Sequence, residues 1–263
     1  MDKIVIITGG SSGIGLETAK RLAAAGCRVY EFSRREAEFN FMRHICVDVA
    51  DAEAVRAGVE EVVAREGRVD VLINNAGMGV SGAFEFTEEA EARRLMDVNL
   101  FGMNNTIRAV LPHMRAAGRG RIVNLSSVAG PLPIPFQAWY SISKAAVNAL
   151  TMALANEVRP FGVTVCCVMP GDIRSGFTAA RRKSLVGDDV YSGRIERSVS
   201  RMERDEQNGM DPAAAGRFIA RLALKRRVRP YNTLGIVYKG CILLSKLLPG
   251  PLIRFILEKM YAQ

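Results

Sequence analysis

The sequence has 263 residues, of which 49% are hydrophobic and 24% charged, so the chain can bury a full core and is not disordered. Five cysteines without a CxxC pair and only two histidines exclude a disulfide framework and argue against a metal site. A net charge of +9 favours anionic partners, namely a phosphorylated cofactor, an acidic membrane surface or nucleic acid.

The chain begins MDKIVIITGG and enters a strand-like segment at once, without the pattern of a secretory signal peptide. We therefore expect a cytoplasmic protein, with membrane-surface association left open.

Short apolar runs rich in β-branched residues alternate with helical patterns, as in strands buried on both faces of a parallel sheet. The alternation predicts an α/β fold with a Rossmann-type, doubly wound parallel sheet of about seven strands and helices on both faces. No linker is visible before residue 172, and there is no internal repeat, so we predict one domain over residues 1–263. The predicted strands are Ile4–Thr8, Arg28–Ser33, His44–Asp48, Val71–Asn74, Arg121–Ser126 and Val163–Met169, and the predicted helices are Gly15–Ala25, Ala52–Arg65, Glu88–Ala117 (a break near Asn99 left open) and Ala138–Arg159.

The first strand runs directly into a glycine-rich turn that opens the first helix. Glycines let the backbone approach a pyrophosphate closely, and the helix N-terminus favours its negative charge. Serine hydroxyls in the turn can add hydrogen bonds. The order of strand, turn and helix makes a dinucleotide site the favoured interpretation, although the spacing is GxxxGxG and not GxGxxG. The turn residues are Gly9, Gly10, Ser11, Ser12, Gly13, Ile14 and Gly15.

The same letters also satisfy G-x-S-x-G, the nucleophile elbow of α/β-hydrolases. That reaction needs a downstream histidine as general base, and only His44 and His113 exist. His113 falls in a helical stretch with no evident acidic partner, so a hydrolase is strongly disfavoured.

The end of the second strand indicates which dinucleotide is bound. An acidic residue there binds the ribose 2′-hydroxyl of NAD, whereas a basic one accommodates the 2′-phosphate of NADP. Neutral Ser33 followed by Arg34 favours NADP(H), since a guanidinium matches a phosphate. Glu31 leaves NAD(H) open. If the register of the strand were two residues earlier, Glu31 would be the acidic residue that binds the ribose 2′-hydroxyl.

Two further strand ends are expected to line the same cofactor. Asp48-Val49 ends the third strand, where a carboxylate can accept a hydrogen bond from the adenine amino group. Asn75, Ala76 and Gly77 follow the fourth strand, where small residues let the backbone approach the adenosine ribose.

Tyr140 and Lys144 stand at i and i+4, on one face of the fourth predicted helix. Ser127 lies thirteen residues before Tyr140, after the fifth strand. The ordinary pKa of tyrosine is about 10, so proton transfer at neutral pH needs a shift of roughly three units. A cation one turn away, assisted by oxidised nicotinamide, lowers the pKa in that direction.

Taken together, these motifs resemble the short-chain dehydrogenase/reductase family over nearly the whole chain. The matching segments are TGGSSGIG (8–15), NNAG (74–77), Asn99, Ser127, YSISK (140–144) and Pro170-Gly171.

The resemblance implies catalytic roles for four residues. Tyr140 would be the general acid/base that exchanges a proton with the substrate oxygen, and Ser127 would orient that oxygen. Lys144 would lower the pKa of Tyr140 and bind the nicotinamide ribose, and Asn99 would hold a water of the proton relay. The resemblance also implies that Pro170, Gly171 and Ile173 border the nicotinamide, with Ser175 where many members have threonine.

Two later regions have their own character. Residues 172–210 are charged and follow the sixth strand, which fits a substrate lid as well as a solvated helix pair. Residues 234–263 are apolar but interrupted by charges and by Pro249-Gly250-Pro251, which excludes a membrane span and predicts two amphipathic helices. Capping a pocket or packing on the domain is favoured for this extension over lying on a membrane.

The extension replaces the glycine-rich closing strand of acyl-carrier-protein ketoreductases and of many tetrameric family members. The chain therefore looks more like members that act on steroids, retinoids or other lipophilic alcohols and ketones. In the family the Tyr140 helix builds a dimer interface, so the resemblance implies a homodimer, although core packing within one subunit would explain the same small residues. They are Ala145, Ala146, Ala149, Ala153 and Ala155.

We therefore expect an NADP(H)-dependent oxidoreductase that acts on a lipophilic secondary alcohol or ketone. The alternatives are a 3-ketoacyl reductase and a non-catalytic NAD(P)-sensing regulator on the same fold. Binding to nucleic acid is not expected, because the basic residues are spread out and match no binding module.

Overall fold

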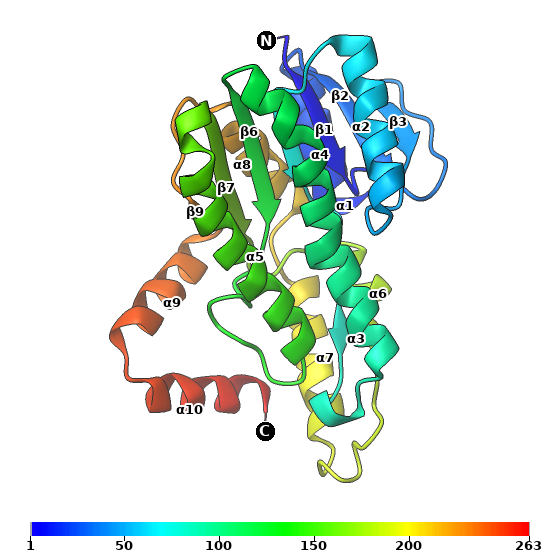
Figure 1. The fold of residues 1–263 in the computed structure, drawn as a ribbon. Helices are drawn as coiled ribbons and strands as arrows, with labels where there is room; N and C mark the ends of the chain where they lie inside the picture. Colours follow the sequence, from blue (N-terminus) through cyan, green and yellow to red (C-terminus); the bar gives the residue numbers. More distant parts are fainter. Residues whose placement is uncertain (1, 263) are drawn as a thin grey trace.

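Within residues 2–262, which the computed structural model describes, seven parallel strands form one sheet with helices on both faces (Figure 1). This arrangement confirms the predicted Rossmann-type fold. The strands lie side by side in the order β3 (Arg43–Cys46), β2 (Arg28–Ser33), β1 (Ile4–Thr8), β4 (Val71–Asn74), β6 (Gly120–Leu125), β7 (Val163–Met169) and β9 (Tyr231–Thr233).

Four of the six predicted strands have the observed bounds, and the β6 prediction is one residue late. The prediction of His44–Asp48 is wrong at its end, because β3 stops at Cys46. Asp48 instead begins the turn into the next helix, and its carboxylate accepts a hydrogen bond from the Ala50 amide at 3.0 Å.

The core has two layers, one on each face of the sheet. Alternate residues of β1 point to opposite faces, so that Ile4 and Ile6 join one apolar cluster and Val5 and Ile7 the other. The helices that complete the first cluster are α2 (Ala52–Glu66), α4 (Gly102–Ala116) and α5 (Ala138–Glu157), and those of the second are α1 (Gly13–Ala24) and α8 (Pro212–Leu224).

The predicted helix Glu88–Ala117 consists of α3 (Glu89–Met96) and α4 joined by a π-helical turn, Asp97–Phe101. The helix therefore widens near Asn99 and does not break. Such single π turns are frequent at functional sites.

A chain of buried polar groups crosses the centre of the sheet. Thr106 on α4 donates to Asn74 at 2.6 Å, Asn74 donates to Asn124 at 3.0 Å, and Asn124 donates to Thr151 on α5 at 3.0 Å. Since each buried group is paired, polar residues are tolerated in β4 and β6 without the penalty of an unsatisfied donor or acceptor.

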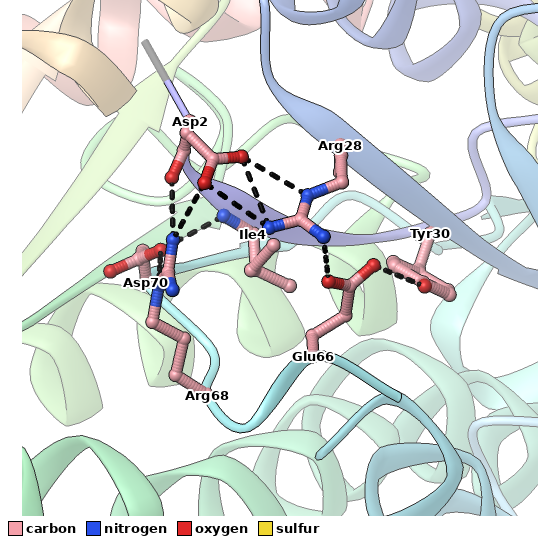
Figure 2. Close-up of polar contacts among 7 residues, drawn as sticks. All are labelled: Asp2, Ile4, Arg28, Tyr30, Glu66, Arg68 and Asp70. Carbon is pink, nitrogen blue, oxygen red and sulfur yellow. Dashed lines mark hydrogen bonds and ion pairs between the residues drawn. The ribbon is translucent and has the colours of Figure 1, made fainter. Parts of the chain in front are cut away.

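The amino edge of the sheet is tied together by charged side chains (Figure 2). Asp2 contacts both Arg28 and Arg68, and Arg28 also pairs with Glu66 at the end of α2. Glu66 accepts a hydrogen bond from the Tyr30 hydroxyl at 2.6 Å. The candidate site lies at the opposite, carboxyl edge of the sheet.

The region 172–210 folds back over the carboxyl edge. It contains α6 (Phe177–Ala180), α7 (Arg194–Gln207) and the short strand β8 (Arg182–Lys183), which pairs with β5 (Val80–Ser81).

The C-terminal extension forms the two predicted helices, α9 (Ile236–Leu247) and α10 (Gly250–Tyr261), which meet at Pro249. In Figure 1, α9 runs away from β9 and α10 turns back toward α7. No helix in the described part of the chain has the length and apolar character needed to cross a membrane.

Candidate active site

The glycine-rich turn connects β1 to α1 at the carboxyl edge of the sheet. Gly9 has φ +63°, a left-handed conformation that favours glycine. A Cβ atom at Gly15 would lie 2.3 Å from the Gly9 carbonyl oxygen, so the turn cannot close around a larger residue there. A Cβ atom at Gly13 would meet only Ser175, at 3.6 Å, which leaves space above the start of α1. These features fit a pyrophosphate at the helix N-terminus.

The serine hydroxyls of the turn face no protein partner among the described residues. Ser12 is the N-cap residue of α1, yet its side chain makes no capping hydrogen bond. The structure thus leaves the hydroxyls of Ser11 and Ser12 available to a ligand, and their contact with a cofactor stays a prediction.

The turn after β4 is bonded directly to the glycine-rich turn. Thr8 Oγ1 accepts hydrogen bonds from the amides of Asn75 at 3.1 Å and Ala76 at 3.0 Å. The Asn75 side chain donates to the carbonyl oxygens of Thr8 and Gly9. Residues 75–77 and the glycine-rich turn therefore form one continuous wall.

Glu31 lies beneath the glycine-rich turn and not at the strand end. Its side chain is fully buried, and one carboxylate oxygen accepts from the Gly10 amide at 2.9 Å. The other oxygen contacts Ser33 Oγ at 3.1 Å and His44 Nδ1 at 2.6 Å. Strand β2 continues to Ser33, so Glu31 does not stand at the strand end, where an acidic residue would bind the ribose hydroxyl. Arg34 lies exposed just beyond the strand.

Asp48 and Val49 lie in the turn after β3 and not at the end of the strand, where the sequence predicted them. Asp48 forms an ion pair with Arg94 on α3 at 2.8 Å. Burial opposes ionisation, but the hydrogen bonds from Arg94 and the Ala50 amide outweigh it and lower the pKa of Asp48. The Val49 carbonyl oxygen accepts from Asn105 at 3.0 Å, which holds this turn against α4.

Tyr140 and Lys144 share one face of α5. Lys144 Nζ lies 5.6 Å from the centre of the Tyr140 ring and donates to the Leu125 carbonyl oxygen at 2.9 Å. Ser127, two residues beyond the end of β6, forms a hydrogen bond with Tyr140. The three side chains therefore converge at the carboxyl edge.

The protein groups around Tyr140 do not by themselves lower its pKa. Burial raises the pKa of Tyr140 to about 12, against the smaller opposing effects of the Ser127 hydrogen bond and the Arg181 charge. Burial also lowers the pKa of Lys144 to about 8. Lys144 is not among the main groups that act on the pKa of Tyr140 in the chain alone, where desolvation dominates.

The titration of Lys144 leads to a prediction about pH. Since its pKa is about 8, its charge is lost above that pH, together with its assistance to proton transfer. We expect kcat/KM for ketone reduction at saturating cofactor to be level below pH 8 and to fall about tenfold per unit above it. A level profile from pH 7 to 10 would contradict this. In Lys144→Arg, whose side chain stays charged, the break should move to higher pH.

Asn99 is held by the π-helical turn next to Lys144. Its side-chain oxygen accepts from the Met78 amide at 2.8 Å, and its nitrogen donates to the Met78 carbonyl at 2.9 Å and to Ser143 Oγ at 3.1 Å. A Cβ atom at Gly77 would lie 3.2 Å from the Asn99 oxygen and 3.8 Å from Lys144 Nζ, so both groups flank that glycine. Its assignment to a water relay stays a prediction.

The turn after β7 completes the wall. The Pro170 carbonyl oxygen accepts from the Val128 amide at 3.0 Å. Ile173 lies in a bridge with Met210 whose hydrogen bonds use the backbone groups of Asp172, Arg174 and Met210, not those of Ile173. Its own amide and carbonyl are therefore not used by this bridge.

Several contacts at the site are not visible in the sequence. The Phe177 ring lies 5.8 Å from the Tyr140 ring, and Arg181 is buried beside it and paired with Glu206. On the other side, the Tyr238 ring packs so closely on Gly171 that a Cβ there would lie 2.1 Å from it. Of the site residues that the sequence did not assign, only Ser143, which accepts a hydrogen bond from Asn99, could have been found, because it stands one helical turn after Tyr140 in YSISK.

The Tyr238 hydroxyl also bonds to the next residue of this turn. It donates to the Asp172 carboxylate at 2.6 Å and accepts from the Asp172 amide at 3.1 Å. Helix α9 is thereby fixed to the turn that follows β7.

The histidines take no part in a hydrolase arrangement. His44 is bonded to Glu31 below the turn, and His113 contacts Glu60 at 3.1 Å on the outer helices. Neither donates to or accepts from a serine of the glycine-rich turn in the described structure, so the nucleophile-elbow alternative lacks its base.

Comparison with known proteins gives a consistent result. Residues 3–185 match the family model described as short chain dehydrogenase. The chain is 42% identical over 265 residues to 3-ketodihydrosphingosine reductase of Bacteroides thetaiotaomicron. The aligned region covers 99% of this chain and 98% of the relative. It is 38% identical over 197 residues to 3-oxoacyl-[acyl-carrier-protein] reductase of Staphylococcus aureus, with 70% and 80% coverage.

Solved structures agree. A short-chain dehydrogenase from Streptomyces avermitilis superposes with a TM-score of 0.85 at 34% identity, covering 98% of this chain and 95% of that one. ElxO with NADP bound has a TM-score of 0.75 at 25% identity, with 91% and 100% coverage. The 3-ketoacyl-(acyl-carrier-protein) reductase of Brucella melitensis in complex with NADH has a TM-score of 0.74 at 26% identity, with 89% and 96% coverage. Nicotinamide cofactors of both kinds thus occur among the structural neighbours.

Proposed function

The chain belongs to the short-chain dehydrogenase/reductase family and is an oxidoreductase, and we propose that it uses NADPH to reduce the ketone of a long-chain 3-keto lipid. The observation that carries the reaction type is the convergence of Tyr140, Ser127 and Lys144 beside the glycine-rich turn.

Each residue has a defined part in the reduction. The nicotinamide, when bound, supplies the hydride that adds to the carbonyl carbon. Ser127 donates a hydrogen bond to the carbonyl oxygen and orients it, while Tyr140 transfers its phenolic proton to that oxygen. The product is the alcohol, and Tyr140 regains a proton from solvent along Lys144 and Asn99.

The preference for NADPH rests on the end of β2. Arg34 lies exposed beyond neutral Ser33, where a guanidinium can pair with a 2′-phosphate. Glu31, the acid that the sequence offers as an alternative partner for a ribose hydroxyl, has both carboxylate oxygens occupied inside the protein. This arrangement supports NADP(H) over NAD(H).

The lipid class is supported by the relative that matches along the full chain, a 3-ketodihydrosphingosine reductase. Such a substrate carries an amine next to its ketone. Asp172 acts electrostatically on Tyr140 and forms no ion pair within residues 2–262, so it is the candidate for balancing that ammonium group, whereas Glu206 is already paired with Arg181.

The region 172–210 is proposed as the lid over this substrate. Phe177 contacts the Tyr140 ring, and Ser175 lies next to Gly13 of the glycine-rich turn. The segment from Ser175 to Phe177 therefore lies beside both the glycine-rich turn, where the pyrophosphate would bind, and Tyr140, where the ketone would react.

The substrate is tested by steady-state kinetics with NADPH and three ketones: 3-ketodihydrosphingosine, a 3-ketoacyl thioester and a steroid ketone. We expect the amino ketone to give the highest kcat/KM, at least about tenfold above the others. The thioester as best substrate would instead support the 3-ketoacyl reductase alternative, for which the S. aureus relative speaks. NADPH binding with no turnover on a wider ketone panel would support a sensing regulator.

We also propose that the protein is a homodimer through α5. Ala145, Ala149 and Ala153 recur on the exposed side of this helix, next to Ile142 and Met152, which are also exposed. Small residues permit a close approach of two helices, while Ala146 and Ala155 are partly covered within the subunit.

A further inference from the structure

The exposed apolar side chains of this protein are concentrated in the C-terminal helices. Of the seventeen large hydrophobic residues that are exposed in the described structure, nine lie between residues 236 and 260. Soluble monomers rarely expose a contiguous apolar surface of this kind without a partner. We call residues 236–262 the arm. Its exposed apolar residues are Ile236, Val237, Leu243, Leu244, Leu247, Leu252, Phe255, Ile256 and Met260.

The two faces of α9 have different surroundings. Tyr238 and Ile242 point inward, Tyr238 onto the turn at Gly171 and Ile242 into a small core with Cys167 and Met169. The outward face repeats at helical spacing, and its ends, Ile236 and Leu247, are 85% and 73% exposed. The helix is therefore anchored on one side and apolar on the other.

The charge of the arm is one-sided. Its sequence contains Lys239, Lys246, Arg254 and Lys259 but only one acid, Glu258. None of these four cations forms an ion pair within residues 2–262. An apolar helix face flanked by unpaired cations is the pattern of helices that lie in the interface of an anionic membrane.

A basic groove continues this surface onto α7. The groove, of about 430 Å³, lies where the end of α10 meets α7, and Arg197, Arg201, Arg204 and Lys259 line it with Glu196 as the one acid. Ser198, which also lines it, is 2% exposed, and its hydroxyl has no hydrogen-bond partner in the described structure. Arg201 is already paired with Asp205, whereas Arg204 and Lys259 form no ion pair within residues 2–262 and are the donors that anionic headgroups would meet.

From these observations we propose that the arm binds the surface of an anionic lipid bilayer, with its apolar face in the acyl region and the α7–α10 groove at the headgroups. A second copy of the chain fits less well, because a self-complementary contact would bring the same cations together.

The arm lies close to the candidate site, which relates the proposed membrane contact to the substrate. Strand β9 runs parallel to β7, so α9 begins at the carboxyl edge of the sheet, the edge that holds the candidate site. A bilayer on the arm therefore lies at the site's end of the molecule. If the proposed function holds, a lipid ketone would reach the site without leaving the bilayer entirely.

Vesicle flotation of the full-length protein tests the proposal without any substrate. We expect binding to vesicles of phosphatidylglycerol and phosphatidylcholine in equal parts, with much weaker binding to pure phosphatidylcholine and loss of binding at high salt. Leu247→Glu should weaken binding at least about tenfold, because a leucine is removed from the acyl region and a carboxylate is added. Lys239→Glu with Lys246→Glu should weaken it by a similar factor.

Phe161→Glu is the matched control. Phe161 is 44% exposed but precedes β7, at the opposite edge of the sheet, so the same added charge should leave flotation unchanged. Turnover of a small water-soluble ketone and the mass in solution are measured for each variant. Absence of wild-type binding to anionic vesicles would overturn the proposal, as would a Leu247→Glu variant that halves the mass in solution and still floats.

Discussion

Replacing Tyr140 by Phe is expected to lower kcat for ketone reduction by about 10²- to 10⁴-fold, since the reaction loses its proton donor. The ring itself should stay in place, because it is held by Phe177 at 5.8 Å and lies next to Lys144. Affinity for NADPH, measured by fluorescence titration, should therefore change by no more than about twofold.

Tyr30→Phe provides a matched control for the loss of a phenol. The Tyr30 hydroxyl donates a hydrogen bond to Glu66 at 2.6 Å within the ion-pair cluster (Figure 2), at the amino edge of the sheet and opposite the candidate site. This variant should keep the wild-type kcat. Equal turnover in Tyr140→Phe and wild type would remove the acid/base assignment, whatever the effect on folding.

Replacing Arg34 by Ala is expected to separate the two cofactors. A charge-assisted contact with the 2′-phosphate is worth about 1.5–3 kcal/mol, so the Kd for NADPH should rise about ten- to hundredfold. The Kd for NADH should barely change, because it has no such phosphate. Isothermal titration with both cofactors measures the difference directly.

Arg65→Ala is the control for the loss of a surface guanidinium. Arg65 lies in the last turn of α2 and pairs with Glu61, so its removal should leave both Kd values unchanged. Equal weakening of NADPH and NADH by Arg34→Ala would instead show that the arginine does not read the phosphate.

Much of the fold could be predicted because its signals are local. The runs Ile4–Thr8 and Val163–Met169 are continuously apolar, and their bounds follow from composition alone. Strand β9 was not located, because Tyr231–Thr233 has three residues and gains its identity only by pairing with β7. Helix α8 was also missed, although Asp211 as N-cap and Pro212 at the first helical position are recognisable start signals.

The candidate site also has parts that could be predicted from the sequence and parts that could not. The glycine-rich turn, NNAG and YSISK are continuous segments, so their positions could be read from the sequence. The position of Glu31 under Gly10 depends on how β2 packs beneath the turn, and the bond between Asp172 and Tyr238 joins residues 66 apart. The pKa values of Tyr140 and Lys144 depend on burial, which spacing on a helix does not reveal.

The hydrogen bonds between Tyr238 and Asp172 make the C-terminal extension part of the sheet edge that holds the candidate site. Deleting residues 234–263 to obtain a shorter, more soluble enzyme would expose Gly171, against which the phenol ring now rests, and release the neighbouring carboxylate. A truncated protein would therefore differ from the native one in its chemistry as well as its solubility, and engineering of the helices should leave position 238 untouched.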